Sequence, residues 1–186
     1  RFSFLGPCAT IIMDYFVRGV ALIILGIDPG YAILGYGVVQ TQGASVRPVD
    51  YGVIETKAGT PFPERLEKLY AGVRALCLTH KPEAVSFEEL FFARNVTTAI
   101  QVGGGRGVAL LAAQEFGAPL YEYTPMQIKL AVTGDGHADK AQVQQMVRIL
   151  LKLRQAPKPD DAADALGAAI CHANTIGPAA EEFRIR

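Results

Sequence analysis

Cysteine is scarce in this sequence, and the three cysteines present lie far apart. Cys8, Cys77 and Cys171 are odd in number and form no CxxC pair. A disulfide framework or a cysteine-based zinc site needs paired or closely spaced cysteines, so the sequence supports neither. Free buried thiols in a reducing cytosol fit this pattern, and we expect a cytoplasmic protein.

An excess of charge of either sign is also lacking. The chain of 186 residues has 18 basic and 18 acidic side chains, so the net charge gives no sign of a nucleic-acid or acidic partner. A basic groove beside an acidic site would also sum to zero, and nucleic-acid binding therefore stays open. The length is typical of one domain with its own core.

No long hydrophobic run continues without a charge. Residues 2–27 are the candidate, but Asp14 and Arg18 interrupt them and no small-residue cleavage site follows. A membrane span needs about 20 apolar residues, and a secretory signal ends at such a cleavage site. We therefore expect no targeting segment there.

Three strands are predicted at the start of the fold. The run 22–27 is apolar, and 31–42 and 46–56 are rich in β-branched and aromatic residues. A short "GAS" turn separates the second run from the third, which predicts an antiparallel meander. The first strand ends in Asp28, and the Pro-Gly pair after it is typical of a turn.

Helices and strands alternate over the rest of the chain. Apolar residues three and four apart predict an amphipathic helix over 61–80, and a buried strand follows at 83–92. A helix from about Thr97 to Phe116 is closed by Gly117. The later elements are a strand over 118–123, a helix beginning at Pro125, and helices near 138–154 and 161–176. This order predicts an α/β fold with a mixed five-stranded sheet flanked by helices.

Four carboxylates stand out by their positions. Asp28 ends the first strand and Glu88 ends the fourth, while Asp161 and Asp164 lie at the start of the last helix. Helix residues three apart share a face, so this last pair can point at one site. Acids in a first helical turn also serve as caps and match the helix dipole, so the pair alone favours a structural role.

Taken together, the acids favour metal binding. Carboxylates at the ends of two strands and the start of a helix can converge, and clustered anions repel one another unless cations neutralise them. Oxygen ligands suit hard divalent cations, here Mg²⁺, with Mn²⁺ able to substitute. Two such ions about 4 Å apart can activate water and stabilise a leaving oxygen at phosphorus. The pattern predicts a two-metal phosphodiester hydrolase, provided that the acids converge.

Several blocks resemble the RuvC Holliday junction resolvases. They are "GIDPG" with "GYGVV", "FEELFFARN", "GRGVALLAA", "YTPMQIKLAVTGDGHADKAQV" and "DDAADALGAAICH", in this order from Leu22 to about Asn174. The resemblance implies a ribonuclease H-like nuclease domain over 22–176, with an N-terminal extension at 1–21 and a C-terminal tail at 177–186. It also implies a homodimer that works with the RuvA-RuvB branch-migration complex and resolves junctions in recombination and repair. Its paired nicks, in two strands of like polarity, depend on Mg²⁺.

The resemblance assigns roles to single residues. The family's catalytic, metal-binding acids fall on Asp28, Glu88, Asp161 and Asp164, although some members have His at the position of Asp161. Glu89 competes with Glu88, but strand alternation turns the two side chains to opposite faces. The pattern "FEELFFARN" places Glu88 at the catalytic position.

Four further residues match DNA-contacting positions of the family, namely Phe91, Arg94, Lys129 and Lys140. The ring and the guanidinium offer flat surfaces for unstacked bases, and the lysines match those near the scissile phosphate. Core packing is an equally good interpretation for Phe91. Ordinary solvated helix charge is the alternative for both lysines.

Two other patterns carry less chemistry. The glycines of "GGGRG" at 103–107 lie inside a helical pattern, whereas a dinucleotide site needs them between a strand and a helix. Close approach of another helix explains them better, and similar proteins use this helix in their dimer. His80, His137 and His172 show no metal-ligand spacing, and we expect them at the surface or in caps.

Three alternatives stay open from the sequence. Sugar kinases and heat-shock-protein ATPases begin with a similar strand, acid and glycine turn, but they need more chain than 186 residues. The YqgF proteins are shorter, and the segment 123–158 and the "DDAAD" helix fit RuvC better. A junction-binding module without activity would lack one of the four acids, and none is missing.

Overall fold

The computed structural model describes residues 21–90 and 96–186, and its centre is a five-stranded sheet in the order β3-β2-β1-β4-β5. The strands are β1 (Leu22–Asp28), β2 (Ile33–Gln42), β3 (Ser45–Glu55), β4 (Ala84–Glu88) and β5 (Leu120–Tyr123). The first three form the expected antiparallel meander. Strands β4 and β5 run parallel to β1, which confirms the mixed sheet.

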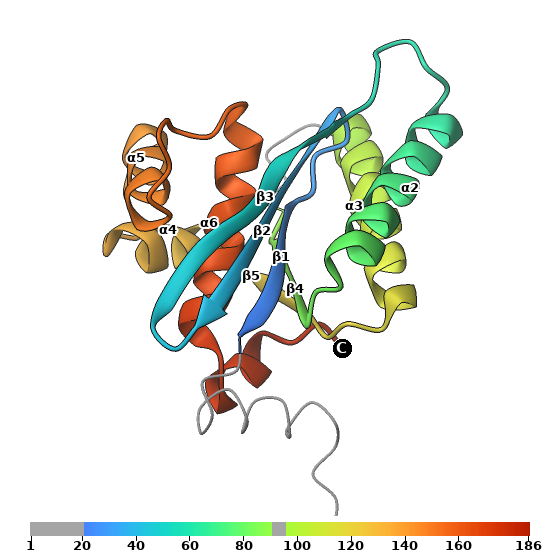
Figure 1. Cartoon of the computed structure of the whole chain (residues 1–186). Coiled ribbons are helices and arrows are strands. Elements are labelled where there is room, and N and C mark those ends of the chain that lie inside the picture. Colours follow the sequence, from blue (N-terminus) through green and yellow to red (C-terminus); the bar gives the residue numbers. More distant parts are fainter. Residues whose placement is uncertain (1–20, 91–95) are drawn as a thin grey trace, which may run out of the picture.

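Helices cover both faces of this sheet (Figure 1). One face carries α2 (Phe62–His80) and α3 (Val96–Phe116), and the other carries α4 (Pro125–Thr133), α5 (Lys140–Leu150) and α6 (Asp160–Thr175). The helices agree with the predicted ranges to within a few residues at their ends. The strand expected over 83–92 is shorter, because the ladder between β4 and β5 ends at Glu88.

Strand β1 is buried from both sides. Ile24 packs into the core under α4, α5 and α6, whereas Leu25 and Ile27 pack into the core under α2 and α3. All three are fully inaccessible to solvent. A strand that is covered on both faces has a continuous apolar sequence, which explains "LIILGI". The buried strand also holds the following Asp28 on a rigid support.

Helix α6 lies unusually close to the sheet. A Cβ atom added to Gly26 of β1 would stand 2.0 Å from the carbonyl oxygen of Ala165, and one added to Gly35 of β2 would stand 2.0 Å from that of Asp161. Gly35 is the register partner of Asp28. The missing side chain at Gly35 therefore lets the first turn of α6 lie directly over the end of β1.

The carboxyl ends of β1 and β4 and the start of α6 share one edge of the sheet (Figure 1). At the opposite edge, residues 177–186, expected as a tail, include a 3₁₀ helix, η1 (Pro178–Phe183). Beyond it, the backbone N–H of Ile185 donates to the Leu120 carbonyl at 2.9 Å.

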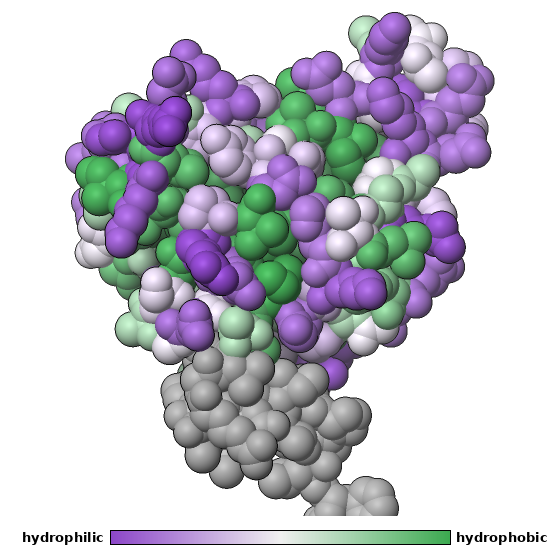
Figure 2. Space-filling model, in the orientation of Figure 1, coloured by the Kyte–Doolittle hydropathy of each residue, from purple (hydrophilic) through white to green (hydrophobic). Residues whose placement is uncertain are grey.

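The surface over the meander is mixed in character. Strand β3 has no fully buried residue, and Figure 2 shows hydrophilic residues spread over this side with smaller hydrophobic patches between them. Within the described part of the chain, no helix is both long and apolar enough to cross a membrane.

Candidate active site

The four predicted acids interact with one another at the shared edge. Burial, followed by the negative charges of Glu88, Asp164 and Asp161, raises the pKa of Asp28 from 3.8 to about 8. Such repulsion acts only between charges that lie close together. The acids from three separate places in the sequence are therefore close enough in the fold to influence one another through charge.

Glu88 is coupled to this cluster. Burial raises the pKa of Glu88 to about 7, with Asp164 adding to the rise. Its neighbour Glu89 follows the end of β4, and its backbone N–H donates to the Tyr123 carbonyl at 2.9 Å. Alternation of side chains predicts that Glu89 points away from the face on which Glu88 lies.

Lys140 supplies positive charge to the cluster. Its Nζ lies 3.2 Å from Oδ2 of Asp164 and 3.4 Å from Oδ2 of Asp160. Partial burial lowers the pKa of Lys140, but the charges and hydrogen bonds of Asp164 and Asp160 outweigh it and raise the pKa overall. The same ammonium lowers the pKa of both Asp28 and Glu88, so it faces most of the cluster.

The fold places Lys140 and Lys129 near these acids in different ways. Lys140 is the first residue of α5, and Asp139 caps this helix with a reciprocal pair of bonds to Gln142. Lys129 lies in the middle of α4 and lowers the pKa of Glu88. Both predicted lysines therefore approach the acids, whereas Phe91 and Arg94 lie outside the described residues.

The donor set suits a hard cation. All four acids offer carboxylate oxygens, the ligands that Mg²⁺ and Mn²⁺ prefer, and the raised pKa of Asp28 and Glu88 marks negative charge that the protein itself does not fully compensate. Among residues 21–90 and 96–186, no three His, Cys, Asp or Glu side chains are grouped closely enough to hold a metal as they stand. The acids are coupled by charge, with the Lys140 ammonium nearby, and they fit the ion in chemistry.

Comparison with known proteins identifies the family. A profile described as crossover junction endodeoxyribonuclease RuvC matches residues 24–172. A relative of that name from Brevibacillus brevis is 57% identical over 150 residues, which cover 81% of this chain and 90% of the relative. The chain belongs to the RuvC family.

Solved structures agree with this membership. RuvC of T. thermophilus in complex with a Holliday junction substrate matches with a TM-score of 0.78 and 44% identity, over 82% of this chain and 93% of that one. A further structure of Thermus thermophilus RuvC gives 0.77 and 41%, over 88% and 98%. The ribonuclease H-like fold and the enzyme class, a crossover junction endodeoxyribonuclease, are confirmed. The RuvC match also favours this family over the YqgF and kinase-like alternatives.

One of the three histidines lies in the core of the fold. His172, expected at the surface or in a cap, is 3% exposed in α6, and that expectation was wrong. Its Nδ1 lies 2.8 Å from the hydroxyl of Tyr123, and burial lowers its pKa to about 4. A neutral, hydrogen-bonded ring of this kind belongs to the core.

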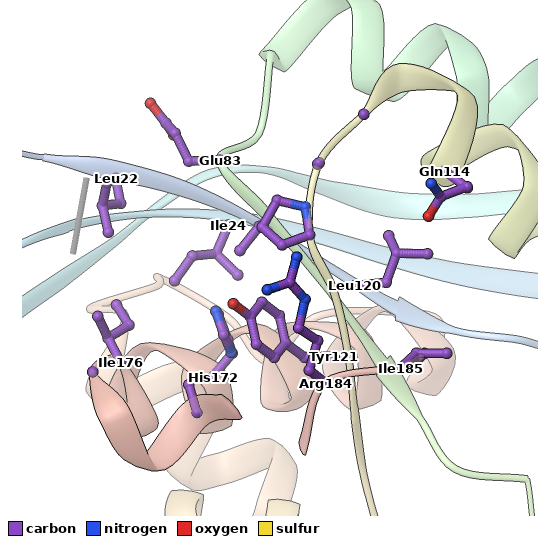
Figure 3. Close-up of a pocket in the computed structure, with 16 residues that line it drawn as sticks. Leu22, Ile24, Glu83, Gln114, Leu120, Tyr121, His172, Ile176, Arg184 and Ile185 are labelled. Atoms are coloured by element: carbon purple, nitrogen blue, oxygen red, sulfur yellow. The ribbon is translucent and has the colours of Figure 1, made fainter. Parts of the chain in front are cut away.

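A cavity of about 340 Å³ lies beside His172, at the edge of the sheet where β1, β4 and β5 begin. Figure 3 shows the His172 ring next to that of Tyr121, with Arg184 and Leu120 close by. None of the four acids lines this cavity. The acids instead occupy the opposite edge, where β1 and β4 end.

Helix α2 packs against two of the glycines in "GGGRG". A Cβ on Gly104 would stand 2.8 Å from the ring of Phe62, and one on Gly105 would stand 3.2 Å from Leu69, both in α2. Around Gly103 and Gly107, nothing in the described chain lies within 4 Å of such an atom. The expectation of close helix approach is confirmed for α2, and one side of α3 stays open.

Sequence reasoning missed two features of the site. Asp160 binds Lys140, although only the acids three apart in "DDAAD" were selected from the sequence. The second missed feature is the close packing of α6 against β2. Its signal in the sequence is the pair of alternate glycines in "LGYG", because small residues on one face of a strand permit close helix packing. Gly35 is the one that brings Asp161 over Asp28.

Proposed function

We propose that this protein resolves Holliday junctions by paired nicking of two strands of like polarity, with two Mg²⁺ ions per active site. Asp28, Glu88, Asp161 and Asp164 would hold the ions. The observation that carries the proposal is the electrostatic coupling of Asp28 to the other three acids. Divalent cations at such a site would polarise the scissile phosphate and activate water.

The chain's own groups divide the remaining work. The buried strand β1 fixes the position of Asp28. The close packing of α6 against Gly35 fixes Asp161 and Asp164 at the start of that helix. Lys140 and Lys129 place positive charge beside Glu88, where they attract a DNA phosphate and offset the repulsion between that phosphate and the acids. Phe91 and Arg94 are proposed to contact the opened base pairs of the junction.

A homodimer would set two such sites against two strands. Helix α3 exposes Ile100 and Leu111, at 67% and 51% of their surface, on the side where Gly103 and Gly107 are open. We place the nuclease domain at residues 22–176 and the enzyme in the cytoplasm. Its implied partner in the cell is the RuvA-RuvB branch-migration complex.

The decisive experiment is cleavage of a labelled mobile four-way junction in Mg²⁺ and in a chelator. Symmetric cuts are expected only for active enzyme with metal. Asp28→Asn and Glu88→Gln should each lose at least about 100-fold in rate, because the metal contributes several kcal/mol. Glu89→Gln is the matched control and should cut normally.

Junction binding separates chemistry from folding. Asp28→Asn removes a negative charge from a surface that meets phosphates, so it should bind junctions at least as well as the unchanged protein. Intact junctions alongside degraded single-stranded RNA would overturn the proposal, as would tight ATP binding without junction binding.

A further inference from the structure

Arg65, in the first turn of α2, is held in a fixed orientation by two neutral groups. Its Nε donates to the hydroxyl of Thr56 at 2.8 Å, and that hydroxyl donates to the Tyr31 carbonyl, also at 2.8 Å. The guanidinium carbon lies 3.7 Å from the centre of the Tyr31 ring. Thr56 and Tyr31 are both buried, so the support beneath the guanidinium is rigid.

The positive charge of Arg65 has no counter-charge among the residues that the structure describes. Within residues 21–90 and 96–186, no carboxylate lies at ion-pair distance from it, and its two terminal nitrogens have no acceptor. A guanidinium has five N–H donors, and the bond to Thr56 uses only the one on Nε. A cation in a first helical turn also opposes the helix dipole. Neither the described carboxylates nor the helix dipole accounts for a cation at this position, which points to a ligand outside the fold.

Arg65 stands on the acid-bearing edge of the sheet. Tyr31 follows Asp28 by three residues, a span of at most about 10 Å along the chain. A Cβ on Gly105 of α3 would stand 3.5 Å from the Tyr31 Cα, so the support is packed from the other side as well. A single DNA strand advances about 3.4 Å per nucleotide, which puts Arg65 within about six nucleotides of the site of cleavage.

We propose that Arg65 binds a phosphate group of the DNA backbone that flanks the cleaved bond. The hydrogen bond to Thr56 occupies Nε, and the Tyr31 ring covers one face of the guanidinium. The free edge with its terminal N–H groups is left to bind phosphate oxygens in a bidentate manner. This inference rests on the proposed junction cleavage.

The test is the salt dependence of junction binding, measured by fluorescence anisotropy in a chelator so that no cutting occurs. Each lost phosphate contact reduces the slope of log affinity against log salt by about 0.9. Arg65→Gln should therefore reduce the slope by about 1 per protomer and weaken binding about tenfold at 0.1 M salt. Arg65→Lys keeps the charge and should retain most of the slope.

Arg47→Gln is the matched control. Arg47 also has a neutral partner, Gln40, but it is exposed near the turn between β2 and β3, at the other end of the sheet from the acids. Its loss should leave the slope unchanged. If Arg65→Gln lowers the unfolding temperature while its slope equals that of Arg47→Gln, Arg65 only ties α2 to the turn and the inference fails.

A second measurement holds even where Arg65→Gln folds poorly. Neutral methylphosphonates are placed one at a time in the junction strand, within six nucleotides of the cut. The unchanged protein should lose affinity at one of these positions, and Arg65→Ala, which keeps neither the charge nor the N–H donors, should lose less there, as coupling between the two groups requires. Equal losses for both proteins at every position would overturn the inference. Cleavage of the unmodified junction by the unchanged protein tests the proposed function separately.

Discussion

At the scale of single residues, the acids that make the site useful also cost stability. Asp28 has an ordinary pKa of 3.8, which burial and then the neighbouring acids raise to about 8 in the fold. A carboxyl of this kind loses its proton more readily when the chain unfolds. Its contribution therefore begins to oppose folding above about pH 4 and reaches full size above about pH 8.

Asp28→Asn should accordingly stabilise the metal-free protein while it abolishes cutting. The gain should grow between pH 5 and pH 8.5 and exceed about 1 kcal/mol, because one pKa unit corresponds to about 1.4 kcal/mol. For a chain of this size, each 1 kcal/mol raises the unfolding temperature by about 2–4 °C. Thermal unfolding in a chelator at the two pH values measures the gain.

The control for this prediction is Glu182→Gln, which removes an exposed acid at the far edge. Its unfolding temperature should match that of the unchanged protein at both pH values. Added Mg²⁺ should stabilise the unchanged protein, since a bound ion favours the folded state, and should do so much less for Asp28→Asn. A variant that is less stable at every pH would mean that Asp28 holds the fold together.

The acids could be predicted from the sequence because each stands at the end of a recognisable element. Asp28 and Glu88 end apolar runs, and Asp161 and Asp164 begin a helix. The orientation of Arg65 could not be predicted from the sequence, since its partners Thr56 and Tyr31 are nine or more residues away along the chain. His172 was misjudged for a related reason, because nothing local to α6 reveals the Tyr123 hydroxyl that binds it.

At the scale of elements, the contact between α6 and the sheet decides the geometry of the site. The strands and helices themselves follow from apolar periodicity and turn residues, so their order was predictable. The close distance between α6 and the strands β1 and β2 was not predicted, because it depends on which strand glycines face the helix. Gly26 and Gly35 both face it, and they replace the usual side-chain layer with direct backbone contact.

Gly35→Ala should therefore damage both stability and cutting. The new methyl group would stand 2.0 Å from the Asp161 carbonyl oxygen, so α6 must shift away from Asp28. Forced overpacking of this kind costs about 1–3 kcal/mol, and a displacement of about 1 Å at a catalytic site can cost about 100-fold in rate. Urea unfolding and junction cleavage measure the two effects.

Gly107→Ala is the control for the effect of the glycine-to-alanine change on stability alone, because Gly107 lies on the proposed dimer face. Nothing in the described chain lies within 4 Å of the added atom, and alanine favours a helix interior by up to about 1 kcal/mol. Its stability should be equal or higher. A Gly35→Ala protein that cuts at the normal rate would show that the close seat of α6 does not position Asp161.

At the scale of the whole molecule, paired cutting needs two sites with a fixed spacing. The open side of α3 offers an interface, because Ile100 and Leu111 are exposed there beside two glycines. Small residues let two helices approach closely, and exposed apolar side chains gain stability when a second copy covers them. In Figure 1, α3 lies beside α2, on the other side of the sheet from α6, whose first turn carries Asp161.

Leu111→Glu should convert the protein into a monomer, because a carboxylate would be buried without a partner in the interface. Leu130→Glu is the matched control, since Leu130 of α4 is exposed to a similar degree, 56%. Light scattering after size exclusion gives the mass of each. On a supercoiled plasmid with a cruciform, the monomer should leave nicked circles where the unchanged protein, as the proposed dimer, should leave linear DNA. A monomeric Leu130→Glu with a dimeric Leu111→Glu would place the interface on α4 instead.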